Sequence, residues 1–232
     1  MATHAVIVGA GKGSRMNRAT PKQYLPLRGI PVLGHTVGAF DQCTEVDHII
    51  LVVSPTDISF CRDQLLAGLR FEKPITVVGG GEKRQDSVLN GILSIDDTHG
   101  IVVIHDGVRP LIQAKLISRC IKEADIHGAC ILGLPLQDTL KSADQHERAE
   151  KTLLREHMWL AQTPQAFRYK LIRKAHVTAQ KEGFVATDDA SLLERLGIPV
   201  QIIAGSKHNL KITTEEDLVL ADAILSHRKS QL

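Results

Sequence analysis

Residues 5–15 read Ala-Val-Ile-Val-Gly-Ala-Gly-Lys-Gly-Ser-Arg, so that a short apolar run passes directly into a glycine-rich loop. A short apolar run that ends at glycines is typical of a buried β-strand. Because Gly9, Gly11 and Gly13 carry no Cβ, the N–H groups of this loop can approach a phosphate closely. The stretch therefore predicts a first strand that ends at a phosphate-binding loop, with a tight turn that binds nothing as the alternative.

The rest of the chain continues the alternation of strand and helix. Strand-like apolar runs recur at 48–53, 75–78, 101–105 and 129–134, and helical spacing lies between most of them, as at 32–40 and 111–126. Continuous apolar strands separated by helices predict a mostly parallel sheet that is covered on both faces. We therefore expect an α/β, doubly wound, twisted sheet in a single domain, since a chain of 232 residues that is 43% hydrophobic can form one large core.

Unusual loops follow three of the predicted strands. They are the glycine loop at 9–15, Gly-Gly-Gly-Glu-Lys-Arg at 79–84 and Asp-Gly-Val-Arg-Pro at 106–110. Ligands of doubly wound sheets bind at the carboxyl ends of the strands, so we expect these loops to form one site. Their basic residues suit a compact anion, although Lys83 and Arg84 could equally belong to a solvated surface loop.

Residues 136–160 break the alternation. Short strands are predicted at 138–143 and 152–160 around a highly charged tip at 144–151, which indicates a protruding β-arm. An exposed hairpin is marginal by itself and would be buried by pairing with a second copy, so we expect the arm to be a dimerisation element. After it, the pattern predicts helices at 168–181 and 188–196, a strand at 200–204, and a last helix capped by Thr214 and Asp217.

Composition argues against several classes of function. A formal net charge of +2 is far below that of a typical nucleic-acid-binding domain, so no nucleic-acid partner is expected. No apolar run reaches the roughly eighteen residues of a membrane span, and the chain starts directly with a strand, so we expect a cytoplasmic protein with no membrane partner. Cys43, Cys61, Cys120 and Cys130 are too far apart for a zinc knuckle or a redox pair.

The glycine loop matches neither of the common nucleotide-binding motifs. A Walker loop ends in Gly-Lys-Ser/Thr, whereas Lys12 precedes the last glycine here, and a dinucleotide loop needs glycine where Ser14 stands. The second predicted strand ends in Val-Ser-Pro at 53–55, without the acidic residue that holds a ribose hydroxyl. A Walker-type nucleotidase and a dehydrogenase are therefore disfavoured. A serine hydrolase is disfavoured too, since there is no Gly-x-Ser-x-Gly elbow.

The glycine loop and the segment after it resemble a known family. Residues 9–16, Gly-Ala-Gly-Lys-Gly-Ser-Arg-Met, and residues 21–24, Pro-Lys-Gln-Tyr, closely resemble the signature Ala-Ala-Gly-x-Gly-x-Arg-Met…Pro-Lys-Gln-Tyr of 2-C-methyl-D-erythritol 4-phosphate cytidylyltransferases. Segments that agree in the same order follow at 86–88, 105–110, 138–139, 163–165, 187–191 and 209–213. The chain departs from the family pattern at Gly9, Glu82, Gly107, Val108 and His208.

This resemblance implies a Rossmann-like nucleotidyltransferase that moves CMP from CTP to 2-C-methyl-D-erythritol 4-phosphate and releases pyrophosphate, in isoprenoid precursor biosynthesis. Attack on a phosphorus that already bears negative oxygens requires fixed cations. The resemblance places Arg15 and Lys22 at the transition state. It makes Arg155, with its planar fork, the group that positions the acceptor phosphate, and gives Lys211 an assisting catalytic role.

The resemblance also implies the binding residues. Nucleotide contacts fall on Ala10, Gly11, Lys12, Gly13, Gly81, Glu82, Ser87, Asp106 and Gly107. Acceptor contacts fall on Arg109, Thr139, Thr163 and Thr187, and a purely structural pair with Asp106 is the alternative role for Arg109. Mg²⁺ is expected because it bridges phosphate oxygens and takes few protein ligands, with Asp106 as the one candidate ligand. If Arg155 serves the site of a neighbouring subunit, the arm makes a homodimer with shared sites.

Two other functions remain open on the sequence. Ribitol-5-phosphate cytidylyltransferases share the fold, the glycine loop and Pro-Lys-Gln, whereas Pro-Lys-Gln-Tyr, Arg155 and Asn-Leu-Lys-Ile-Thr at 209–213 favour the methylerythritol branch. A non-catalytic nucleotide-binding regulator would keep the fold without turnover. The presence of Arg15, Lys22, Arg155 and Lys211 argues against such a regulator.

Overall fold

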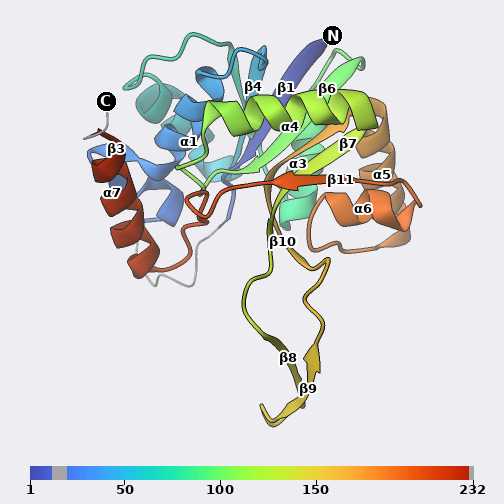
Figure 1. The fold of residues 1–232 in the computed structure, drawn as a ribbon. Coiled ribbons are helices and arrows are strands. Elements are labelled where there is room, and N and C mark those ends of the chain that lie inside the picture. Colours follow the sequence, from blue (N-terminus) through green and yellow to red (C-terminus); the bar gives the residue numbers. More distant parts are fainter. Residues whose placement is uncertain (12–19, 230–232) are drawn as a thin grey trace.

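The computed structural model describes residues 1–11 and 20–229, so that Lys12, Gly13 and Arg15 of the predicted site lie outside the described residues. The described chain forms a seven-stranded sheet in the order β11-β7-β10-β6-β1-β4-β5 (Figure 1). Its strands are β1 (Ala2–Val8), β4 (His48–Val53), β5 (Ile75–Gly79), β6 (Gly100–Asp106), β7 (Ala129–Pro135), β10 (Trp159–Arg168) and β11 (Gln201–Ala204). Only β10 runs antiparallel to its neighbours, which confirms the predicted mostly parallel sheet.

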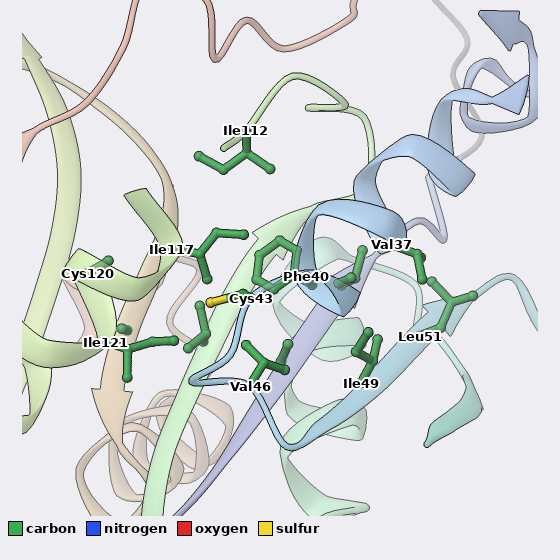
Figure 2. Close-up of a cluster of buried hydrophobic side chains, with 14 of the residues drawn as sticks. Val37, Phe40, Cys43, Val46, Ile49, Leu51, Ile112, Ile117, Cys120 and Ile121 are labelled. Atoms are coloured by element: carbon green, nitrogen blue, oxygen red, sulfur yellow. The ribbon is translucent and has the colours of Figure 1, made fainter. Parts of the chain in front are cut away.

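Helices cover both faces of this sheet, as the alternation predicts (Figure 1). They are α1 (Val32–Asp41), α2 (Ile58–Phe60), α3 (Arg84–Leu93), α4 (Ala114–His127), α5 (Tyr169–Glu182), α6 (Ala190–Arg195) and α7 (Glu215–Lys229). On one face, Phe40 of α1, Ile117 of α4 and Leu51 of β4 belong to one buried cluster (Figure 2). On the other face, Ile92 of α3 and Ile172 of α5 belong to a separate buried cluster. With both faces buried, ligand sites are left to the edges of the sheet.

None of the helices within residues 1–11 and 20–229 combines the length and the apolar character that a membrane crossing requires.

Strand β10 differs from the prediction. The sequence predicts a second arm strand at 152–160, whereas the structure has β9 (Ala149–Leu153) in the arm and β10 in the main sheet. β10 carries Gln162, Thr163 and Gln165 in its middle, and all three are buried because each finds hydrogen-bond partners. A strand with a polar centre produces no apolar run, so periodicity does not detect it.

The arm consists of β8 (Leu140–Ala143) and β9, an antiparallel pair that projects away from the rest of the chain (Figure 1). Its role in dimerisation stays a prediction.

A third apolar cluster joins the two segments that carry Lys22 and Lys211. The short strands β2 (Pro26–Leu27) and β3 (Ile30–Pro31) follow Lys22, and Leu25 and Leu27 pack with Ile212 and with α7. Helix α7 begins after its predicted cap. This small cluster therefore fixes two predicted catalytic lysines relative to each other, although they are 189 residues apart in the sequence.

Candidate active site

A cavity of about 300 Å³ opens at the carboxyl ends of the central strands. It is lined by Val8, Gly9, Ala10, Gly11, Lys22, Gln23, Gly81, Glu82, Lys83, Arg84, Ser87, Asp106, Val108 and Lys211. These residues come from all three loops that the sequence places at strand ends, together with the segments around Lys22 and Lys211. The loops therefore converge in the described part of the chain as predicted.

The glycine loop is held in place by Gln23, which the sequence analysis does not single out. The Gln23 Nε2 group is buried and donates to the carbonyl oxygens of Gly9 and Gly11, at 2.8 and 3.1 Å. On its other side the loop touches the second glycine loop, because a Cβ added at Gly80 would lie 2.6 Å from the Cβ of Ala10. The glycines therefore allow two backbones to meet in the cavity wall.

The N-terminus of α3 forms another part of the wall. Ser87 Oγ accepts the N–H of Gly81 at 3.1 Å and donates to the Lys83 carbonyl at 3.1 Å. Asp86 closes the start of the helix by accepting the Lys83 N–H at 3.0 Å. The positive end of the helix dipole favours an anion here. Of the predicted nucleotide residues on this loop, Gly81, Glu82 and Ser87 all line the cavity.

Two lysines from distant parts of the sequence, Lys22 and Lys211, line the cavity. Lys22 Nζ donates to the carbonyl oxygen of Ile212 at 2.9 Å, and Lys211 Nζ lies 3.0 Å from Asp106 Oδ2. The Ile212 N–H in turn donates to the carbonyl of Val108 at 2.8 Å. The segment at 209–213 therefore positions both lysines at once.

Asp106 lies at the centre of a cluster of charged side chains, here called the charged wall, with Arg84, Arg109 and Lys211 around it. Its Oδ1 lies 3.1 Å from Arg84 Nε, and its Oδ2 lies 3.2 Å from Arg109 Nε as well as close to Lys211. Burial would raise the pKa of the Asp106 carboxyl, but the Arg84, Lys211 and Arg109 cations outweigh burial and hold this pKa well below its usual range. Asp106 is therefore a carboxylate at any working pH, and it fixes three cations in place.

These contacts bear on the predicted metal. Both carboxylate oxygens of Asp106 are already engaged by cations, which would repel Mg²⁺. Within residues 1–11 and 20–229, no three His, Cys, Asp or Glu side chains come together as a metal-binding group. The described residues thus do not fit a metal held by the protein alone, and Asp106 as a ligand stays a prediction that the charges oppose.

A second, smaller cavity of about 130 Å³ adjoins the first. It is lined by Arg84, Asp106, Arg109, Ala161, Gln162, Thr163, Gln165, Thr187, Asp188 and Lys211. Three of these residues, Arg84, Asp106 and Lys211, also line the larger cavity, so the two spaces share one wall. The predicted acceptor residues Arg109, Thr163 and Thr187 lie in this smaller cavity.

Hydrogen bonds tie the smaller cavity to the 209–213 segment. Arg109 Nη1 donates to the carbonyl of Asn209 at 2.8 Å, and Asn209 Nδ2 donates to the carbonyl of Thr163 at 2.7 Å. The Asp106 N–H donates to Thr163 Oγ1 at 3.1 Å. Arg109 therefore pairs with Asp106 and also lines the smaller cavity, and its contact with an acceptor stays a prediction.

The remaining predicted residues lie elsewhere. Arg155 and Thr139 are on the arm and line neither cavity of the described chain; the Arg155 guanidinium donates to the carbonyl of Gln137. Gly107 lies behind the wall, where its N–H donates to the Val8 carbonyl at 2.8 Å and a Cβ would lie 2.7 Å from Leu33. The structure thus gives Gly107 a packing role, and its contact with a nucleotide stays a prediction.

The charged wall predicts a pH-dependent stability. A carboxyl whose folded pKa is lowered stabilises the fold above its unfolded pKa of about 4, and this stabilisation is lost as the pH falls toward the folded value. We expect Asp106→Asn to lower the free energy of unfolding by about 2 kcal/mol at pH 7, less than for a fully buried pair because its cations are partly exposed. Urea unfolding of both proteins between pH 7 and pH 2 measures this.

The difference in the free energy of unfolding between the two proteins should shrink below about pH 4, where protonation begins to remove the stabilisation that the Asp106 carboxylate provides. Asp125→Asn, on the exposed face of α4, provides the control and should follow the wild type. Parallel curves for wild type and Asp106→Asn over the whole pH range would contradict the stated role of the three cations.

Comparison with known proteins agrees with this geometry. The family model described as 2-C-methyl-D-erythritol 4-phosphate cytidylyltransferase matches residues 3–227. Relatives with that name from Pelotomaculum thermopropionicum and Desulforamulus reducens are 46% and 47% identical, over 98% and 97% of this chain and 96% of each relative.

Solved structures are similar over the same length. The 4-diphosphocytidyl-2C-methyl-D-erythritol synthase from Anaerococcus prevotii is 31% identical with a TM-score of 0.85, covering 97% of this chain and 96% of that one. The 2-C-methyl-D-erythritol 4-phosphate cytidylyltransferase from Thermus thermophilus is 31% identical with a TM-score of 0.77, covering 97% and 98%. The resemblance in the glycine loop thus extends along nearly the whole chain, and the chain belongs to the 2-C-methyl-D-erythritol 4-phosphate cytidylyltransferase family.

Proposed function

We propose that this protein transfers CMP from CTP to 2-C-methyl-D-erythritol 4-phosphate, forming 4-diphosphocytidyl-2-C-methyl-D-erythritol and pyrophosphate in isoprenoid precursor synthesis. The observation that carries the proposal, beside family membership, is the pair of adjoining cavities. The larger has a helix N-terminus, glycine loops and two lysines, which suit a nucleoside triphosphate. The smaller has hydroxyl and guanidinium groups, which suit a phosphorylated polyol.

The reaction needs charge compensation more than proton transfer. An oxygen of the acceptor phosphate attacks the α-phosphorus of CTP, the new P–O bond forms, and the bond from the α-phosphorus to the bridging oxygen breaks as pyrophosphate leaves. A phosphate monoester is largely a dianion near neutral pH and needs no general base. Burial lowers the pKa of His105 to about 3, so this histidine is neutral and has no role as an acid.

Lys22 and Lys211 are the described cations placed to stabilise the transition state. The Lys22 ammonium group donates to the carbonyl of Ile212, and the Lys211 ammonium group forms an ion pair with Asp106. These contacts keep both ammonium groups at the rim of the cavity. Fixed cations of this kind act at the moment of reaction without reorganisation. By the resemblance, Arg15 and Lys12 would add to this group from the glycine loop, and Mg²⁺ would be held by the triphosphate oxygens.

We further propose a homodimer in which Arg155 and Thr139 of one arm complete the site of the other subunit. The base of the arm exposes a run of large apolar side chains: Leu154 (78% exposed), Met158 (46%), Trp159 (40%) and Leu160 (55%). Several exposed large apolar side chains within one short segment are typical of a protein interface. The cytoplasmic location and the absence of a nucleic-acid partner stay predictions from composition.

A substrate screen tests the proposed function. We expect release of pyrophosphate with CTP, 2-C-methyl-D-erythritol 4-phosphate and Mg²⁺, and much slower release with ATP, GTP or UTP. Ribitol 5-phosphate should be the poorer acceptor, because it lacks the methyl branch and differs in length. Faster turnover with ribitol 5-phosphate would favour the alternative branch, and binding of CTP without turnover on either acceptor would favour a regulator.

A further inference from the structure

A chain of ionisable side chains leads from the core to the wall between the two cavities. His176 Nε2 of α5 lies 3.2 Å from Asp189 Oδ1, and Asp189 Oδ2 lies 2.9 Å from Arg84 Nη2. Arg84 Nε then lies 3.1 Å from Asp106 Oδ1. Arg84 thus bridges one carboxylate in the core and one in the active site.

The core end of this chain is rigidly held. The side chains of His176 and Asp189 are 0% and 2% exposed. The N–H groups of Asp189 and Ala190 both donate to Gln165 Oε1 at 3.1 Å, which fixes the start of α6 against β10. Burial would raise the pKa of Asp189, but Arg84 and His176 outweigh it and lower this pKa, so Asp189 is a carboxylate.

The shape of the guanidinium explains why an arginine occupies this place. Its planar fork presents Nε and Nη2 in a fixed relation, and here each nitrogen engages a different carboxylate. A lysine has a single ammonium on a flexible stem and cannot hold two carboxylates in the same geometry. The orientation of Asp106 is therefore set by Arg84, which leaves Oδ2 to face Arg109 and Lys211.

We propose that Arg84 is a positioning residue for the acceptor: by bridging Asp189 and Asp106 it fixes the wall of the smaller cavity. This inference rests on the proposed function. It assigns the Lys-Arg pair at 83–84, which sequence alone leaves between a site and a solvated loop, to the site. The Arg84 side chain is 31% exposed, and Arg84→Lys keeps a positive charge beside the two carboxylates.

Steady-state kinetics of Arg84→Lys test this role. We expect the KM for 2-C-methyl-D-erythritol 4-phosphate to rise about tenfold and kcat/KM for this acceptor to fall by roughly 30-fold, since small displacements of an orienting group are costly. The KM for CTP should stay within about twofold of the wild type. The matched control is Arg195→Lys, an exposed arginine paired with Glu182 outside the site, which should leave all constants unchanged.

A double-mutant cycle shows whether Arg84 acts through Asp189. Asp189→Asn is expected to raise the acceptor KM in the same direction, and Arg84→Lys/Asp189→Asn should be no worse than the poorer single variant. Purely additive losses in kcat/KM would overturn the proposal. If Asp189→Asn does not fold, Arg84→Gln takes its place, with the same selective rise in the acceptor KM expected.

The outcomes separate this inference from the proposed function. CTP binding measured by calorimetry and the thermal midpoint of each variant show that the variants are folded. An equal rise in the KM values for CTP and for the acceptor would mean that Arg84 contacts the nucleotide. An unchanged acceptor KM would mean that Arg84 does not position the acceptor. Either result would overturn the inference about Arg84 but would leave the proposed function standing. A wild-type protein that turns over neither acceptor would refute the proposed function itself.

Discussion

Replacing Lys22 with alanine is expected to lower kcat by on the order of a hundredfold or more, while CTP still binds. Lys22 lines the larger cavity, and its Nζ donates to the Ile212 carbonyl at 2.9 Å, which fixes the ammonium group at the site. A positive charge that stabilises the transition state more than the bound substrates raises kcat and leaves the affinity for the substrates unchanged. Pyrophosphate release at saturating substrates gives kcat, and calorimetry gives the affinity for CTP.

Two further proteins make the Lys22 experiment decisive. Lys174→Ala removes a lysine from the exposed face of α5 and should have wild-type kcat, which controls for the change in net charge. Lys22→Arg keeps the charge on a larger group and should recover part of the lost rate. If Lys22→Ala lost only CTP affinity and kept kcat, Lys22 would bind the ground state and the transition-state assignment would be wrong.

The sequence predicts the framework because its signals are local. Apolar runs at 48–53, 75–78, 101–105 and 129–134 correspond to β4, β5, β6 and β7, and the intervening helices follow from helical spacing. β10 escapes prediction because its buried centre is polar: Gln165 is satisfied only by Asp188 and by the N–H groups at the start of α6, more than 20 residues away. Such compensation exists only in the folded chain.

The same limit applies to the site. Glycine loops after predicted strands indicate where ligands bind, because the carboxyl ends of parallel strands lie at the same edge of the sheet. The role of Arg84 depends on its distance to Asp189, 105 residues later in the sequence, and nothing local distinguishes it from a solvated arginine. Likewise, Gln23 stands in the Pro-Lys-Gln-Tyr motif, but only the structure shows that it holds the glycine loop.

Mixing two inactive variants is expected to restore activity if the arm completes the site of the other subunit. Lys22→Ala removes a cation from the body of the chain, and Arg155→Ala removes one from the arm, so each homodimer lacks a group at both sites. In a mixed dimer, one site loses both groups, while the other pairs an intact Lys22 with an intact Arg155. Random exchange makes half of the dimers mixed, so about a quarter of wild-type activity should return.

The amount of recovery separates shared sites from sites within one chain. If Arg155 served its own subunit, every site in every mixture would lack one group, and the activity would stay at the level of the single variants. The control mixes Lys22→Ala with Lys211→Ala: both lysines line the same cavity of one chain, so no mixed dimer contains an intact site and no activity should return. Subunit exchange itself is verified by native mass spectrometry of the mixtures. Full activity in a monomeric protein upon dilution would refute the shared site, because Arg155 donates to the Gln137 carbonyl of its own chain and lines neither cavity of the described residues.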